Sequence, residues 1–144
     1  MVGIAAIQQS AALPFAYRRR GIKVLLVTSL GTRRWILPKG HLEPGLTACE
    51  SAESEALEEA GVVGTMTTRC LGSYDYRKRP EKGGERCRVR VYALEVTRIL
   101  EEYPEAAIRK RQWMSVQKAI KAVQEPGLKV LLERFEKEFA KSAA

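Results

Sequence analysis

Apolar residues recur in short runs along the first two thirds of the chain, a pattern that favours β-strands, and their spacing becomes helical towards the C-terminus. A basic turn at residues 18–21 separates the first two runs. A flexible loop at residues 80–85, which contains Gly83 and Gly84, separates two later runs and predicts a hairpin. We therefore expect strands over residues 11–17, 22–29, 35–37, 62–76 and 86–97, the fourth of them long or broken.

A helix is predicted in the middle of the chain by its own start and stop signals. Thr47 is followed three residues later by Glu50, the pattern of a capping box, in which a hydroxyl and a carboxylate accept from each other's backbone N–H groups. Gly61 stands where a helix stop is expected. The helix is therefore predicted to run from about residue 48 to residue 60.

Two further helices are expected near the C-terminus. Ser115 can cap a helix that reaches about residue 123, and Pro126 with Gly127 interrupts it. Residues 128–139 have the amphipathic spacing of a terminal helix. This alternation of strands and helices indicates an α/β protein.

Three carboxylates share one face of the predicted central helix. Glu55, Glu58 and Glu59 are spaced i, i+3 and i+4, so their side chains converge on one stripe. Like charges at this spacing repel one another unless a cation lies among them. Hard oxygen ligands suit Mg²⁺ or Mn²⁺, together with water and phosphate oxygens. Taken alone, this spacing is more typical of a solvated acidic face on a surface helix.

Length and composition fit one domain. The 144 residues, 45% of them hydrophobic, suffice for one packed core, so a single domain over residues 1–144 is expected. No run approaches the length of a membrane span, and residues 1–14 lack the basic start of a signal peptide. The cysteines are odd in number and fit no zinc pattern, so we expect a cytoplasmic protein with free thiols at Cys49, Cys70 and Cys87.

Positive charge is concentrated in the predicted hairpin. The net charge is +8, and residues 76–90 hold seven basic residues against two glutamates. Strand alternation places Arg86, Arg88 and Arg90 on one face. The planar guanidinium group binds phosphate through paired, charge-assisted hydrogen bonds, so this face is a candidate phosphate-binding surface. The alternative is a solvated edge, since charged residues commonly protect exposed strands.

A second basic cluster precedes a tryptophan. Arg109, Lys110 and Arg111 could reach the same phosphate from another loop. Trp35 and Trp113 each follow arginines, and they are interpreted as core residues, with stacking on a nucleobase as the alternative.

Residues 40–62 resemble the Nudix box, whose pattern is G-x5-E-x7-R-E-U-x-E-E-x-G-U with U apolar. Leu46 stands where the pattern has its first Glu, and Ser54 stands where it has Arg. In the family that arginine helps to orient the glutamates, and Glu43 or Glu53 are candidates to replace part of the polar surroundings. The matching positions are Gly40, Glu55, Ala56, Glu58, Glu59, Gly61 and Val62.

The resemblance continues on both sides of the box. Residues 24–29, 34–40, 92–97, 100–103 and 109–113 look like the corresponding segments of diphosphoinositol polyphosphate phosphohydrolases and their bacterial relatives. This resemblance implies a Nudix α/β/α sandwich around a mixed β-sheet. It also implies that Glu55, Glu58 and Glu59 bind Mg²⁺ or Mn²⁺ with the carbonyl of Gly40, and Glu55 is the candidate to deprotonate a water. The candidate substrate-binding residues are Ser29, Arg34, Lys39, Arg86, Arg88, Arg90, Arg109 and Arg111.

The function implied is Mg²⁺-dependent hydrolysis of a phosphoanhydride bond in a highly anionic molecule, such as an inositol pyrophosphate or a dinucleoside polyphosphate. Loop carboxylates at Glu101, Glu102 and Glu105 are candidates for an additional general base. Two alternatives stay open. One is a binding module for a phosphorylated ligand, with catalysis weakened by Leu46 and Ser54. The other is a role in RNA, either hydrolysing pyrophosphate at 5′ ends or binding through the basic hairpin; the chain has no aromatic RNA-binding motif.

Overall fold

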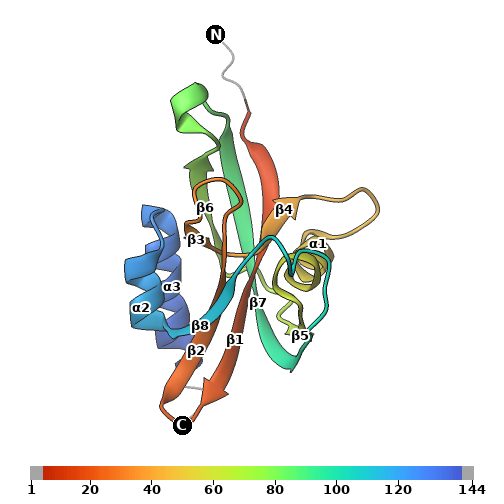
Figure 1. The fold of residues 1–144 in the computed structure, drawn as a ribbon. Coiled ribbons are helices and arrows are strands. Elements are labelled where there is room, and N and C mark those ends of the chain that lie inside the picture. Colours follow the sequence, from red (N-terminus) through yellow and green to blue (C-terminus); the bar gives the residue numbers. More distant parts are fainter. Residues whose placement is uncertain (1–4, 141–144) are drawn as a thin grey trace.

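A mixed β-sheet forms the centre of the computed structural model, which describes residues 5–140 (Figure 1). The predicted single domain over residues 1–144 includes residues 1–4 and 141–144, which lie outside the described part of the chain. The strands are β1 (Ile7–Arg18), β2 (Gly21–Thr28), β3 (Trp35–Ile36), β4 (Lys39–His41), β5 (Val62–Met66), β6 (Gly72–Arg77), β7 (Arg86–Ile99) and β8 (Arg111–Ser115).

The two longest strands, β1 and β7, lie side by side and are parallel, with Ile7 opposite Cys87 and Phe15 opposite Glu95. Most of the sheet follows the order β3, β2, β1, β7, β5. The strand β4 pairs with β1, β6 pairs with β7, and β8 pairs with β2, all of them antiparallel. The sheet is therefore mixed.

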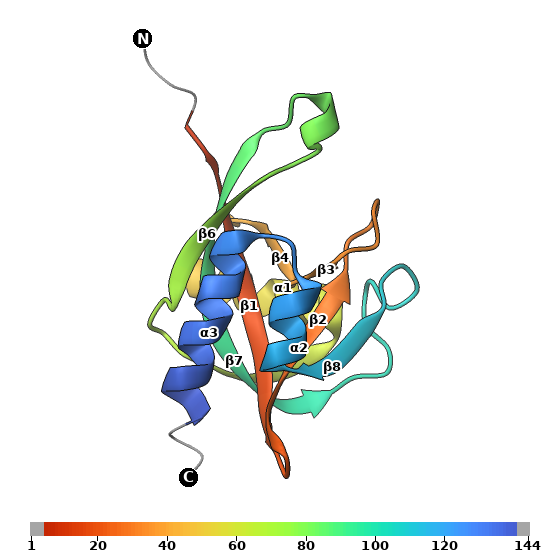
Figure 2. The ribbon, with the colours of Figure 1, turned by 90° about the vertical axis from the view of Figure 1, so that its left-hand side faces the viewer.

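Helices cover both faces of this sheet. The helix α1 (Ala48–Glu55) lies on one side, and α2 (Val116–Ala122) and α3 (Pro126–Ala140) lie on the other (Figures 1 and 2). Alanines of the first helical segment, including Ala52, pack on Leu25 and Leu94 of the sheet. Leu128, Leu132 and Phe135 of α3 join the larger core on the opposite face. The architecture is the predicted α/β/α sandwich.

The predicted capping box is present. Thr47 Oγ1 accepts a hydrogen bond from the Glu50 N–H at 3.1 Å, and the Glu50 carboxylate accepts from the Thr47 N–H at 2.8 Å. After Glu55 the helix widens into a π-helical turn, Ala56–Ala60, that ends at Gly61 with a φ of 65°. The helix thus covers the predicted span, but its second half is not α-helical. Such π-turns often occur at functional sites.

The structure confirms some of the other secondary-structure predictions and corrects others. Residues 62–76 form two strands, β5 and β6, so the broken alternative is correct. The strands β4 and β8 were not predicted, because three and five residues of mixed polarity carry no clear period. Ser115 caps α2 as predicted, by accepting from the Lys118 N–H at 3.1 Å. The last helix begins at Pro126 rather than after it, since proline is well suited to the first helical position.

All three cysteines are free thiols, as predicted. Between residues 5 and 140, no helix is long and apolar enough to cross a membrane.

Candidate active site

Glu59 is the most constrained carboxylate of the π-helical turn. Its Oε1 accepts a hydrogen bond from the Lys39 N–H at 3.2 Å, and its Oε2 lies 3.3 Å from Arg109 Nη2. The side chain is only 7% exposed. Burial is the largest cause that raises the pKa of Glu59, which reaches about 8 although Arg109 opposes the shift. In the absence of a cation, the fold therefore disfavours the charged form.

Glu55 lies against Gly40 of β4. A Cβ atom at Gly40 would overlap the Glu55 carboxylate, so a larger residue at this position would displace that carboxylate from the Gly40 backbone. Burial and then repulsion from Glu58 raise the pKa of Glu55. The structure thus brings together the two box elements, glycine and first helix carboxylate, that the sequence separates by fifteen positions.

Glu58 faces the loop between β7 and β8. Its backbone carbonyl accepts from the Glu105 N–H at 3.0 Å. Burial and then the Glu105 carboxylate raise the pKa of Glu58. Glu105, one of the three candidate loop carboxylates, is therefore placed beside the helix.

The donor chemistry of this site fits a hard divalent cation. The pKa of all three helix carboxylates is raised, and a cation among them would remove that electrostatic penalty. Ser10, opposite Gly40 across the β1–β4 pair, has a buried hydroxyl oxygen with no hydrogen-bond partner among residues 5–140. Among residues 5–140, however, no three His, Cys, Asp or Glu side chains already converge as a cation-binding group. Cation binding at this site would therefore require Glu55 or Glu58 to turn towards Glu59.

A cavity of about 850 Å³ is linked to these carboxylates through Lys39, which lines the cavity and whose N–H is bonded to Glu59; none of the three helix carboxylates lines it. It lies between the β2–β3 turn, the β6–β7 hairpin and the junction of α2 with α3. Six of its lining residues are basic and three are acidic. The basic ones are Arg34, Lys39, Arg77, Lys78, Arg79 and Lys82. One acidic residue, Glu125, is already paired with Arg34 at 3.3 Å. The lining therefore has the charge that a polyanion requires.

Three of the predicted substrate-binding residues line this cavity: Ser29, Arg34 and Lys39. Ser29 Oγ accepts from the Arg34 N–H at 2.9 Å, which fixes the turn that carries both side chains. Lys39 Nζ lies 5.0 Å from the centre of the Tyr76 ring. Burial lowers the pKa of Lys39, with Glu59 and Glu125 opposing the shift.

The strand arginines lie elsewhere. Val89 and Val91 of β7 pack into the core on the α3 side, so strand alternation turns Arg86, Arg88 and Arg90 to the α1 side. None of the three lines the large cavity. The Arg88 guanidinium is paired with Asp75 at 3.0 Å across the β6–β7 hairpin.

Arg109 and Arg111 are engaged within the protein rather than in the cavity. Arg111 Nη1 donates to the carbonyl of Ala60 at 2.8 Å, at the end of the box helix, and its guanidinium lies 4.7 Å from the centre of the Tyr103 ring. Arg109 is bound between Glu59 and Glu105.

The hairpin tip was missed as a set of site residues. Arg77, Lys78, Arg79 and Lys82 were counted as charge but were not assigned to the site. Only the tertiary structure shows that this tip closes one side of the cavity. The nearest signal in the sequence was the density of basic residues beside the glycine pair.

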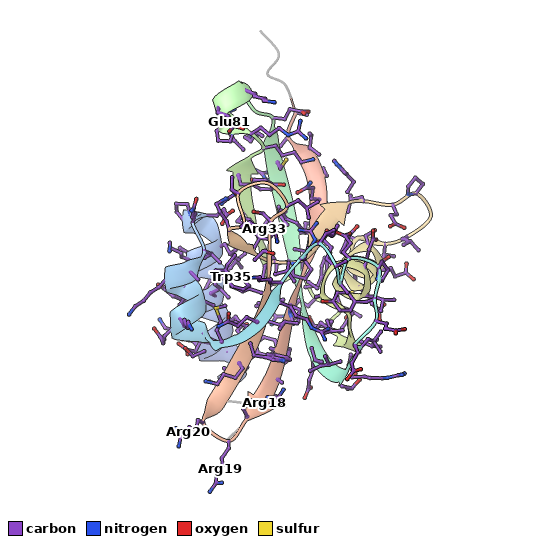
Figure 3. The ribbon with its side chains drawn as sticks, in the orientation of Figure 1. Arg18, Arg19, Arg20, Arg33, Trp35 and Glu81 are labelled. Atoms are coloured by element: carbon purple, nitrogen blue, oxygen red, sulfur yellow. The ribbon has the colours of Figure 1, made fainter. Side chains whose placement is uncertain are left out.

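Other candidates lie away from the cavity. Both tryptophans are partly buried and pack against the core, and Arg18 stacks on the Trp113 ring at 5.0 Å. Figure 3 shows residues 18–20 at the opposite end of the molecule from Glu81, which lines the cavity.

Comparisons with known proteins agree with these features. The Nudix domain family matches residues 8–135. Nudix hydrolase 12, mitochondrial, of Arabidopsis thaliana is 34% identical over 120 residues, which cover 79% of this chain and 58% of that protein. Human diphosphoinositol polyphosphate phosphohydrolase 3-alpha is 35% identical over 119 residues, 81% of this chain and 69% of that protein. The chain thus spans less than two thirds of the length of the plant relative.

Solved structures show the same fold. A Caenorhabditis elegans Ap4A hydrolase has a TM-score of 0.75 at 22% identity, covering 94% of this chain and all of that chain. The Nudix domain of Shewanella oneidensis NrtR, complexed with ADP ribose, has a TM-score of 0.71 at 16% identity, covering 95% of this chain and 90% of that chain. With the box residues gathered on one helix and the family matched along most of the chain, this protein belongs to the Nudix family.

Proposed function

We propose that this protein is a divalent-cation-dependent pyrophosphohydrolase that acts on a highly anionic molecule. One observation carries the proposal. Lys39 lines the basic cavity, and its backbone N–H is bonded to the Glu59 carboxylate at 3.2 Å. A phosphate chain bound in the cavity would therefore lie next to the box carboxylates.

Glu55, Glu58, Glu59 and the carbonyl of Gly40 would hold the cation, Mg²⁺ or Mn²⁺. When bound, it supplies a Lewis acid for a phosphoryl oxygen and lowers the pKa of a water.

Side chains of the protein would accept the proton from water and neutralise the leaving phosphate. Glu55 accepts a proton from the attacking water, a role that suits a carboxylate whose pKa is raised by burial. The water oxygen forms a bond to phosphorus as the bond from phosphorus to the bridging oxygen breaks, and the second phosphate leaves with that oxygen. Arg34 and Lys39 neutralise the charge that moves onto the leaving phosphate.

The candidate substrates are inositol pyrophosphates and dinucleoside polyphosphates. Support comes from the six basic residues of the cavity and from the names of the relatives, a diphosphoinositol polyphosphate phosphohydrolase and an Ap4A hydrolase. Neither tryptophan lines the cavity, so the lining favours contact with phosphate over stacking of a base by tryptophan.

A binding module for a phosphorylated ligand is the second candidate. It is favoured by Leu46 and Ser54 in place of the box Glu and Arg, and by the absence of a preassembled cation site among residues 5–140. A role on RNA is not favoured, because the chain has no aromatic RNA-binding motif.

The experiment is a panel of inositol pyrophosphates, diadenosine polyphosphates, nucleoside triphosphates and triphosphorylated RNA, assayed for phosphate or pyrophosphate release with Mg²⁺ and with Mn²⁺. We expect release from the most anionic small molecules. Saturable binding of the same compounds without release would instead establish the binding module, and release from RNA alone would overturn the substrate class.

A further inference from the structure

Glu59 has an arginine partner although the box has none. In the family the box arginine orients the glutamates, and Ser54 stands at that position here. The partner of Glu59 is Arg109, fifty positions away in the loop between β7 and β8. The fold therefore supplies from outside the box a group that the box lacks.

Arg109 is held by contacts on each of its guanidinium nitrogens. Nη2 lies 3.3 Å from Glu59 Oε2, Nε donates to Glu105 Oε1 at 2.8 Å, and Nη1 donates to the Thr28 carbonyl at 2.9 Å. The side chain is only 9% exposed. A planar guanidinium with three fixed partners has little freedom to rotate, so it can fix the plane of a carboxylate that it contacts.

The loop that carries Arg109 is itself tied to the site. The Glu105 N–H donates to the carbonyl of Glu58 at 3.0 Å. On the other side, the Lys110 N–H donates to Thr28 Oγ1 at 2.9 Å, and the Thr28 N–H donates to the Lys110 carbonyl at 3.0 Å. These bonds join the loop to the box helix and to the end of β2. The position of Arg109 is therefore set by backbone contacts on both sides of it.

We propose that Arg109 is the positioning residue that replaces the missing box arginine and holds Glu59 in the orientation needed to bind the cation. This inference rests on the proposed function, because it assumes that Glu59 is a cation ligand. The contact with Arg109 leaves Glu59 able to bind a cation. Oε1 accepts from the Lys39 N–H and Oε2 contacts Arg109, and each of these oxygens has a second lone pair.

The proposal predicts how Ser54 and Arg109 depend on each other. Ser54 is half-buried and precedes Glu59 by five positions, the spacing that the hydrogen bonds of a π-helix join, and Glu59 lies in the π-helical turn Ala56–Ala60. An arginine at position 54 should add little when Arg109 is present, since Glu59 already has its partner. The same arginine should restore cation binding when Arg109 is removed.

The test is a titration of each protein with Mn²⁺. Binding is measured by calorimetry and, independently, by the electron paramagnetic resonance signal of free Mn²⁺. The variants are Arg109→Gln, Arg109→Lys, Ser54→Arg and the double variant Ser54→Arg with Arg109→Gln. The matched control is Arg69→Gln, which removes an arginine paired with Glu138 outside the site. We expect Arg109→Gln to weaken Mn²⁺ binding by about 10- to 100-fold, the usual effect of removing a group that orients a metal ligand.

The other variants separate orientation from folding. Arg109→Lys keeps the positive charge but loses the planar guanidinium, so it should bind Mn²⁺ more weakly than wild type. This variant tests the inference if Arg109→Gln does not fold. Ser54→Arg should restore binding in the Arg109→Gln protein, and Arg69→Gln should bind like wild type. Unchanged or tighter Mn²⁺ binding by a folded Arg109 variant would overturn the inference alone. Failure of wild type to bind Mn²⁺ would overturn it together with the proposed cation site.

Discussion

Glu59 is the residue on which the proposed cation site depends most directly, because it is buried and contacts both Lys39 and Arg109. Spacing predicts that Glu55, Glu58 and Glu59 share one stripe, and the capping box correctly predicts where the helix begins. The contact of Glu59 with Arg109 joins residues fifty positions apart, and no periodic pattern records such a pair. The sequence could therefore predict the carboxylates but not the arginine that orients one of them.

The pKa of Glu59 predicts how stability depends on pH without divalent cations. Because the folded state raises this pKa from 4.5 to about 8, the folded protein binds the proton more tightly than the unfolded chain. The stabilisation is fully present below about pH 4.5 and is lost as pH rises through about 8. The pKa values of Glu55 and Glu58 are shifted in the same direction, and Arg109 opposes the shift at Glu59.

We therefore expect the free energy of unfolding in EDTA, measured with urea, to fall from about pH 5 to about pH 8, and to fall less steeply in Glu59→Gln. The difference between the two proteins isolates Glu59 from the other titrating groups. Parallel curves for the two proteins would show that the Glu59 pKa is not raised by folding.

At the scale of elements, the β6–β7 hairpin is predicted by the sequence, but the place of its tip in the cavity is not. The glycine pair and the alternating strand correctly indicated a hairpin, and the arginines of β7 do share one face. The cavity, however, is lined by the hairpin tip. That the tip and the β2–β3 turn line one cavity depends on packing across the sheet, which alternation along one strand does not encode.

Arg79 at this tip offers a test that separates binding from folding. Its φ of 46° lies in the left-handed region that favours glycine. Arg79→Gly should therefore leave the free energy of unfolding unchanged or raise it by up to about 1 kcal/mol. It should also weaken the binding of a polyphosphate and reduce the salt dependence of that binding, because one cavity charge is lost. Both quantities can be measured by urea denaturation and by calorimetry at two salt concentrations.

The matched control is Arg19→Gln, which removes a charge at the opposite end of the molecule (Figure 3). This control should bind polyphosphate like wild type. Equal loss of affinity in both variants would mean that net charge, rather than the hairpin tip, determines binding.

At the scale of the whole molecule, the predicted α/β/α layers and the predicted family are both confirmed. The strands β4 and β8 escaped prediction because they are short and are defined by their partners, β1 and β2. These two strands nevertheless position the site, since β4 carries Gly40 and Lys39 and β8 begins two residues after Arg109. Short paired segments therefore connect the box helix to the cavity.

The measurement that tests this account most directly is phosphate release from an inositol pyrophosphate by wild type and by Glu59→Gln, with Mg²⁺ and with EDTA. We predict release by wild type that requires Mg²⁺, and a rate at least about 100-fold lower in Glu59→Gln, because a cation ligand is lost from a helix that stays folded. Equal rates in the two proteins, or release that continues in EDTA, would contradict the assignment of the cation site to the box helix.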